Sequence, residues 1–161
     1  MASRPRSRSH AGFTFAEFGL SLLVLGVVSA VAAPRYIELG SQTRASKLEA
    51  VASSIKVATQ LTRAATIATA GQSGPTGQVV VDGSPVQTRF GYPEASADGI
   101  IAAIGLDLSA QGPDAVRLVP GTQSIRIEVA SAWSQDRCSI TYTAASASAG
   151  PSLSGADTSG C

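Results

Sequence analysis

The sequence predicts an α+β protein in which a long N-terminal helix, membrane-spanning in its first half, packs on a small antiparallel β-sheet head. Three observations lead to this prediction. An apolar run fills residues 13–33, an amphipathic pattern follows it to about residue 70, and short β-prone runs between turn residues follow residue 76. The chain has 161 residues, enough for one domain with a modest core.

The apolar run reads FTFAEFGLSLLVLGVVSAVAA. As a helix its 21 residues would rise about 32 Å, at about 1.5 Å per residue, which matches the hydrocarbon thickness of a bilayer. Arg4, Arg6 and Arg8 precede the run and are expected to hold the N-terminus in the cytoplasm. The sequence therefore predicts a transmembrane helix segment over residues 13–35.

Glu17 sets this run apart from simpler apolar segments. A plain membrane anchor explains the length and the arginines, but not a carboxylate five residues inside the run. A secretory signal has a shorter run and a small-residue cleavage site, which Ala30-Val31-Ala32 imitates. Such a carboxylate either reaches the interface or has a partner or a task, because burying it alone in lipid is costly.

The segment Gly12-Phe13-Thr14-Phe15-Ala16-Glu17-Phe18 resembles the prepilin motif of type IV pilin precursors, with a basic leader before it and an apolar run after it. The resemblance implies that a prepilin peptidase cuts after Gly12 and methylates the new amino terminus of Phe13. Residues 1–12 would then be a leader peptide that is removed on maturation.

The residues of this motif depart from the usual family pattern at three positions, where Phe15, Ala16 and Phe18 replace aliphatic residues but keep the apolar character. Cleavage would expose a positive amine on Phe13, one helical turn before Glu17. We expect Glu17 of an incoming subunit to pair with the Phe13 amine of a subunit in the fibre, since pairing neutralises both charges. This pair would specify axial register.

An amphipathic pattern continues the helix beyond the apolar run, to about residue 70. Apolar and small residues recur there at three- and four-residue spacing: Leu48, Val51, Ile55, Ala58, Leu61, Ala65 and Ala68. Pro34 removes a backbone donor, so a kink or local unwinding is expected there. Gly71 is expected to end the pattern.

Residues 36–161 are predicted to form the head, which includes the amphipathic half of the helix. Its β-prone runs suggest one antiparallel sheet of about four or five strands, with a short helix or irregular connection over residues 94–105. The expected strands are residues 78–81, 86–90, 116–119, 124–129 and 139–143. Residues 90–99 and 138–143 further resemble the mannose-sensitive haemagglutinin branch of type IV pilins.

Two cysteines, Cys138 and Cys161, lie late in the chain. They make a poor zinc site, because zinc usually takes four nitrogen or sulfur ligands. They form either a disulfide in an oxidising compartment or two unrelated free thiols. The pilin resemblance implies the disulfide, which would bound a C-terminal loop displayed on the fibre surface.

The sequence predicts no enzymatic activity, no cofactor and no metal site. The single histidine, His10, lies in the leader, and no nucleophile elbow or phosphate loop is present. Trp133 is expected to pack in the core or at its edge. Without the leader the formal net charge falls from +1 to −2, and no basic patch suggests a nucleic-acid partner.

The resemblance implies a structural subunit that polymerises through its apolar helix into a type IV pilus for adhesion. Its partners would be other copies of itself, the prepilin peptidase and N-methyltransferase, the inner-membrane assembly machinery and the inner membrane. It would begin as a single-pass inner-membrane protein with a periplasmic head and end in the extracellular pilus. A type II secretion pseudopilin, and a membrane-anchored or secreted periplasmic ligand-binding domain, are the alternatives.

Overall fold

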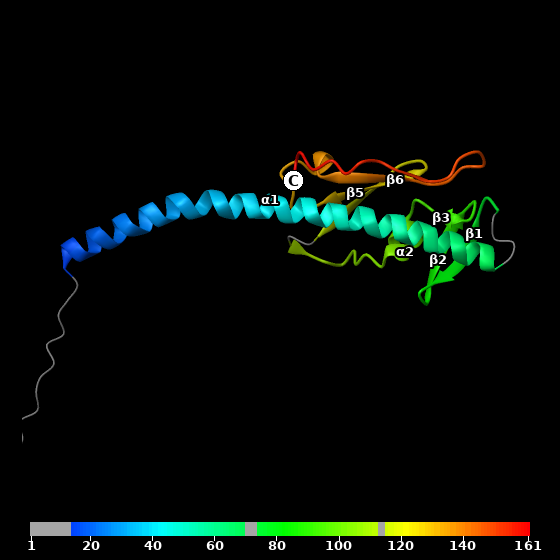
Figure 1. Cartoon of the computed structure of the whole chain (residues 1–161), viewed down its shortest axis with the longest axis horizontal. Helices are drawn as coiled ribbons and strands as arrows, with labels where there is room; N and C mark the ends of the chain where they lie inside the picture. The colour runs from blue at the N-terminus through cyan, green and yellow to red at the C-terminus, as the bar shows by residue number, and fades with distance from the viewer. Residues whose placement is uncertain (1–13, 70–73, 113–114) are drawn as a thin grey trace, which may run out of the picture. The chain divides into compact units, whose positions relative to one another are not determined.

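The computed structural model describes residues 14–69, 74–112 and 115–161 (Figure 1). A single long helix, α1, runs from Phe15 to Ala68, and seven short antiparallel strands follow it in the described chain. The predicted α+β class is therefore confirmed. The chain divides into two compact units between Leu39 and Gly40. The leader, Gly12, Phe13 and Gly71 lie outside the described residues.

Helix α1 matches the helix expected from residue 13 to about residue 70 to within two residues at each end. Pro34 lies inside it, and the kink expected there stays a prediction. Hydroxyl groups along the helix donate to the carbonyl four residues earlier, which satisfies them without breaking the helix. Thr59 and Thr66 do so at 2.7 and 2.8 Å while buried.

The buried face of α1 differs from the predicted one near its end. Leu48, Val51, Ile55 and Ala58 are buried as expected, but Leu61 is 55% exposed. The buried face continues instead through three threonines: Thr59, Thr62 and Thr66. Two of these hydroxyls bond to the helix's own backbone, so burying them costs less than burying a free polar group.

The first sheet has three antiparallel strands in the order β1-β2-β3: β1 (Gly77–Val81), β2 (Ser84–Arg89) and β3 (Tyr92–Pro93). The strands expected over residues 78–81 and 86–90 are present and pair as a hairpin. Its two-residue turn, Asp82 and Gly83, has positive φ at both positions, 49° and 77°. Positive φ at both positions gives the twist that suits a tight hairpin. Phe90 and Gly91 form a second such turn between β2 and β3.

The second sheet is an antiparallel meander in the order β4-β5-β6-β7. Its strands are β4 (Val116–Pro120), β5 (Ser124–Val129), β6 (Ser139–Thr143) and β7 (Ser152–Leu153). The strands thus divide between two sheets instead of the single sheet expected. The short strands β3 and β7 were not predicted, because two residues are too few to show alternation.

Between the sheets, a helical segment places apolar side chains in the core. A π turn spans Ala97–Ile101 and runs into α2 (Ala102–Ile104), within the segment predicted as a short helix or irregular connection. Ile100 and Ile101 are buried there. They join one core cluster with Leu48 and Ile55 of α1 and with the inward face of the second sheet.

Strand β5 shows how the second sheet packs in the unit that begins at Gly40. Ile125, Ile127 and Val129 alternate along it and are all buried, as the sequence pattern predicts. On the opposite face Glu128 is also buried, at 4% exposure, although the alternation suggested an exposed residue. Its carboxylate lies 3.1 Å from Nε of Arg126, and this pairing offsets the cost of burial.

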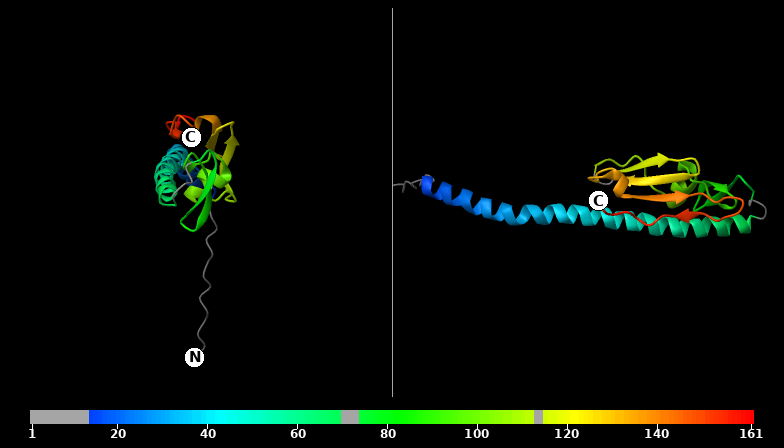
Figure 2. Two further views of the ribbon diagram at one scale, coloured as in Figure 1. Left: turned by 90° about the vertical axis from the view of Figure 1, so that its right-hand side faces the viewer. Right: turned by 90° about the horizontal axis from the view of Figure 1, so that it is seen from above.

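Within this unit both sheets lie along one side of α1 (Figures 1 and 2). The predicted packing of a small antiparallel β-structure on the amphipathic half of the helix is confirmed.

Candidate functional site

The first candidate site is the start of α1, where Thr14 and Glu17 bond to each other. Oε2 of Glu17 accepts hydrogen bonds from the backbone N–H and the hydroxyl of Thr14, both at 2.8 Å. In return, the backbone N–H of Glu17 donates to the Thr14 hydroxyl at 3.3 Å. This reciprocal pair is a capping box, which satisfies donors that a helix start otherwise leaves unpaired.

The capping box uses only one carboxylate oxygen of Glu17. Within the described part of the chain, Oε1 of Glu17 makes no hydrogen bond, and the residue is exposed. Glu17 can therefore cap its own helix and still accept a hydrogen bond from a cationic partner. The Thr14-x-x-Glu17 spacing is the sequence signal for this capping box, which was not among the sequence predictions.

The helix segment after Glu17 exposes its apolar side chains all round. Leu20, Leu23 and Val31 are each at least 63% exposed, and seven other large apolar residues between Phe15 and Val28 exceed half. In the described chain, α1 is the one helix long and apolar enough to cross a membrane, and its most apolar window has no buried residue. Such a surface needs a covering of lipid or protein.

The sequence placed four residues at this N-terminal site. Glu17 and Pro34 lie in α1, 17 residues apart. Gly12 and Phe13 lie outside the described residues, so the processing position and the pairing of the Phe13 amine with Glu17 stay predictions.

The second candidate site is the C-terminal loop. Cys138 and Cys161 form a disulfide, with their Cα atoms 4.8 Å apart, and both are buried. Of the two alternatives for these cysteines, a disulfide or two free thiols, the structure contains the disulfide. Arg44 of α1 donates a hydrogen bond from Nε to the backbone oxygen of Cys161, a contact that the sequence did not reveal.

Backbone hydrogen bonds hold this loop along strand β6. Ser154 donates to Thr141, and Ser139 and Asp157 exchange N–H donors at 3.1 and 3.0 Å. Asp157 in turn accepts bonds from the backbone N–H and the hydroxyl of Ser159, which lower the pKa of its carboxyl. A segment rich in Ser, Gly and Ala is thus held by its ends and by its backbone.

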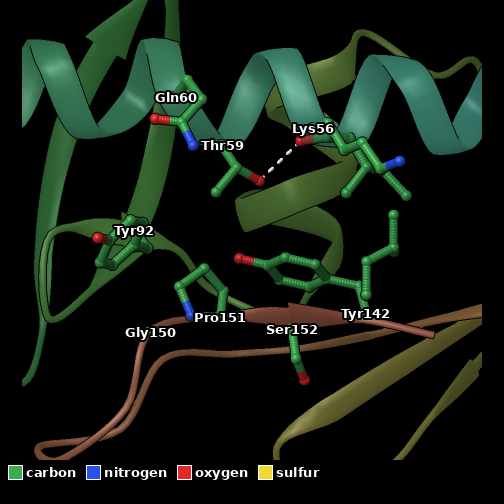
Figure 3. Close-up of a pocket in the computed structure, with 10 residues that line it drawn as sticks. Lys56, Thr59, Gln60, Tyr92, Tyr142, Gly150, Pro151 and Ser152 are labelled. Carbon is green, nitrogen blue, oxygen red and sulfur yellow. Dashed lines mark hydrogen bonds between the residues drawn. The ribbon is translucent and has the colours of Figure 1, made fainter.

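A cavity of about 460 Å³ lies between α1 and the C-terminal loop (Figure 3). Tyr142 forms part of its wall, and its hydroxyl donates to the Pro93 carbonyl at 2.7 Å. Burial raises the pKa of that hydroxyl well above its ordinary value, so it stays protonated at neutral pH. Four other polar side chains in the lining have no hydrogen-bond partner in the described chain: Lys56, Gln60, Tyr92 and Ser152.

The cavity has the size of a small-molecule site. Its lining holds no histidine, cysteine or carboxylate that would act as acid, base or nucleophile. Among the described residues, no group of three or more His, Cys, Asp or Glu side chains is placed to hold a metal ion.

No family model, no curated protein and no solved structure matches this chain.

Proposed function

We propose that this chain is a type IV pilin precursor, a structural subunit that is cleaved after Gly12, N-methylated at Phe13 and polymerised into a surface fibre. The observation that carries the proposal is the build of α1. One helix begins with the capped Glu17, exposes an apolar surface through its first half, and packs in the head core through its second half. An exposed apolar surface of this length needs a covering of lipid or of other subunits.

The same helix surface serves two environments in turn. Before assembly, lipid of the inner membrane covers it, with the N-terminus in the cytoplasm and the head in the periplasm. In the fibre, the helices of other copies cover it. The free Oε1 of Glu17 is then available to the methylated amine of a neighbouring Phe13, so that neither charge is left unpaired in an apolar core.

The experiment that tests this function is to sequence the N-terminus of the protein isolated from cells. We expect mature chains to begin at N-methylated Phe13, and to be found in shed fibres as well as in the inner membrane. Chains that begin after Ala33, or that keep Met1, would overturn the proposal. A Phe13 start with membrane-bound protein but no long fibres would instead support the pseudopilin.

A second function is favoured by one observation, the cavity between α1 and the C-terminal loop. Its volume, and its four polar side chains that make no hydrogen bond within the described chain, fit a small polar ligand. This would be the membrane-anchored or secreted ligand-binding domain, and it predicts a mature chain that does not begin at Phe13.

A further inference from the structure

Trp133 lies in the loop between β5 and β6, and its side chain is 80% exposed. The expectation that it packs in the core or at its edge is wrong. It is the only tryptophan in the chain. Its apolar ring and its indole N–H make it suited to a boundary between apolar and polar surroundings.

The loop of Trp133 lies at the end of its unit where the chain enters from the apolar segment. The next residue, Ser134, donates its N–H to the Gly160 carbonyl at 3.2 Å. Cys161 follows Gly160 and is bonded through its backbone oxygen to Arg44, which is only four residues after the start of this unit at Gly40. Both views in Figure 2 show the orange turn after this loop beside the C-terminus.

The segment that connects the apolar run to this unit is short, so this end of the unit stays near any membrane in which the apolar run is inserted. Seven residues lead from Ala33, the end of the apolar run, to Gly40. They belong to α1, so they advance by only about 10 Å, at about 1.5 Å per residue. The headgroup layer adds about 5–7 Å to each side of the hydrocarbon, so Gly40 stays close to the lipid surface however the unit is turned.

We propose that Trp133 is an interfacial anchor, which inserts its indole among lipid headgroups and holds the Gly40 end of the head on the bilayer before assembly. Tryptophan is enriched at this depth because its ring is apolar and its N–H still reaches polar groups. The exposed neighbours Asp136 and Arg137 have opposite charges, so this surface favours a zwitterionic lipid interface over a strongly anionic one. This inference rests on the proposed membrane insertion of residues 13–35.

Fluorescence of the full chain in phosphatidylcholine vesicles tests the anchor, because Trp133 is the only tryptophan and reports on itself. We expect its emission to lie further to the blue in vesicles than a water-exposed indole gives. Lipids brominated near the glycerol end of the acyl chain should quench it more than lipids brominated near the methyl end. Emission typical of water with no quenching by either lipid would overturn the anchor.

A matched control moves the single indole to the other end of the same unit. Val80 of β1 is 67% exposed, and β1 lies near the opposite end of this part of α1 (Figure 1). The double variant Trp133→Phe with Val80→Trp should float with the vesicles, but the brominated lipids should not quench the emission of its indole. Equal quenching of both chains would overturn the inference, since the effect would then not be specific to the Trp133 loop.

Flotation of the vesicles separates failure of this inference from failure of the proposed function. A chain that floats with the vesicles and resists extraction by salt and alkali has inserted its helix. If it floats and Trp133 is not quenched, the anchor alone is wrong. If it does not float, the membrane insertion on which both proposals depend is wrong.

Discussion

Glu17 shows how one residue can stabilise its own helix and also bind a neighbour. Oε2 accepts two hydrogen bonds from Thr14, while Oε1 makes none in the described chain. From the sequence, this carboxylate was expected to pair with the Phe13 amine of a neighbouring subunit. The structure adds a local reason for a Glu at this position, because a glutamate three residues after a threonine caps a helix start. The local role and the assembly role call for separate tests.

Two substitutions at Glu17 separate its charge from its capping. Glu17→Gln keeps the capping geometry, since glutamine also serves in a capping box, but removes the charge. Glu17→Ala removes the charge and the carboxylate half of the capping box, while the hydrogen bond from the backbone N–H of residue 17 to the Thr14 hydroxyl can remain. We expect both variants to insert and to be cleaved, and neither to form fibres, as measured by electron microscopy and by shed-fibre yield. Fibres from Glu17→Gln would show that only the cap matters.

Tyr142 is the largest fully buried side chain of the head, and its hydroxyl is a second residue-scale test. Tyr142→Phe leaves the buried Pro93 carbonyl without its 2.7 Å hydrogen bond. We expect a loss of about 1–3 kcal/mol in the free energy of unfolding, measured by urea denaturation. Tyr92→Phe is the control, because the Tyr92 hydroxyl has no partner in the described chain and its ring keeps the contact with Arg63. Equal losses in the two variants would contradict this account.

At the scale of elements, the C-terminal loop depends on covalent and backbone bonds more than on apolar packing. Its strand β7 has two residues and pairs only with the end of β6. The disulfide, the Ser139–Asp157 bridge and the bond from Arg44 hold its remaining length. Composition alone predicted a mobile tail, because Ser, Gly and Ala bury little apolar surface.

Reduction of the Cys138–Cys161 disulfide should therefore loosen the loop before the rest of the head. The bond closes a loop across a sequence separation of 23 residues, which corresponds to about 3 kcal/mol in the chain-entropy model. We expect reduction to lower the free energy of unfolding by about 3 kcal/mol, measured by urea denaturation. We also expect the rate of amide hydrogen exchange to rise first in residues 145–160. Cys138→Ser with Cys161→Ser should behave like the reduced protein. Unchanged exchange in the loop on reduction would contradict this role.

At the scale of the whole molecule, the two units have different sources of stability. The unit from Gly40 onward holds a core that draws on α1 and on the second sheet, while the most apolar part of α1 has no buried residue. The apolar segment is thus stable as a helix only in lipid or in contact with other helices. The head needs neither for its own core.

A chain that begins at Gly40 should therefore fold without detergent. We expect a cooperative thermal transition by circular dichroism and a monomer by size-exclusion chromatography. In this shortened chain, Ile127→Ala should cost about 2–5 kcal/mol, because Ile127 is 1% exposed, whereas Val80→Ala should cost little. A shortened chain that shows no cooperative transition would contradict the division at Gly40.

The sequence predicted well those elements whose signal lies in a continuous run of neighbouring residues. The limits of α1, the hairpin at Asp82-Gly83 and the alternation of β5 follow from helical periodicity, turn chemistry and a period of two. Strands β3 and β7 were not predicted from the sequence, because two-residue strands form only when a neighbouring strand supplies their hydrogen bonds. The burial of Thr59 and Thr66 was not predicted, because polarity alone does not show that a hydroxyl bonds to its own helix.

The sequence by itself determined the class of fold, the apolar half of the helix and Glu17 at its start, because each depends on residues close together in the chain. Only the tertiary structure decided that the strands divide into two sheets, that Arg44 holds the disulfide end of the loop, and that Trp133 is exposed. These features depend on contacts between residues far apart in the chain, where a side chain's surroundings are set by the packing of other elements and not by its own neighbours.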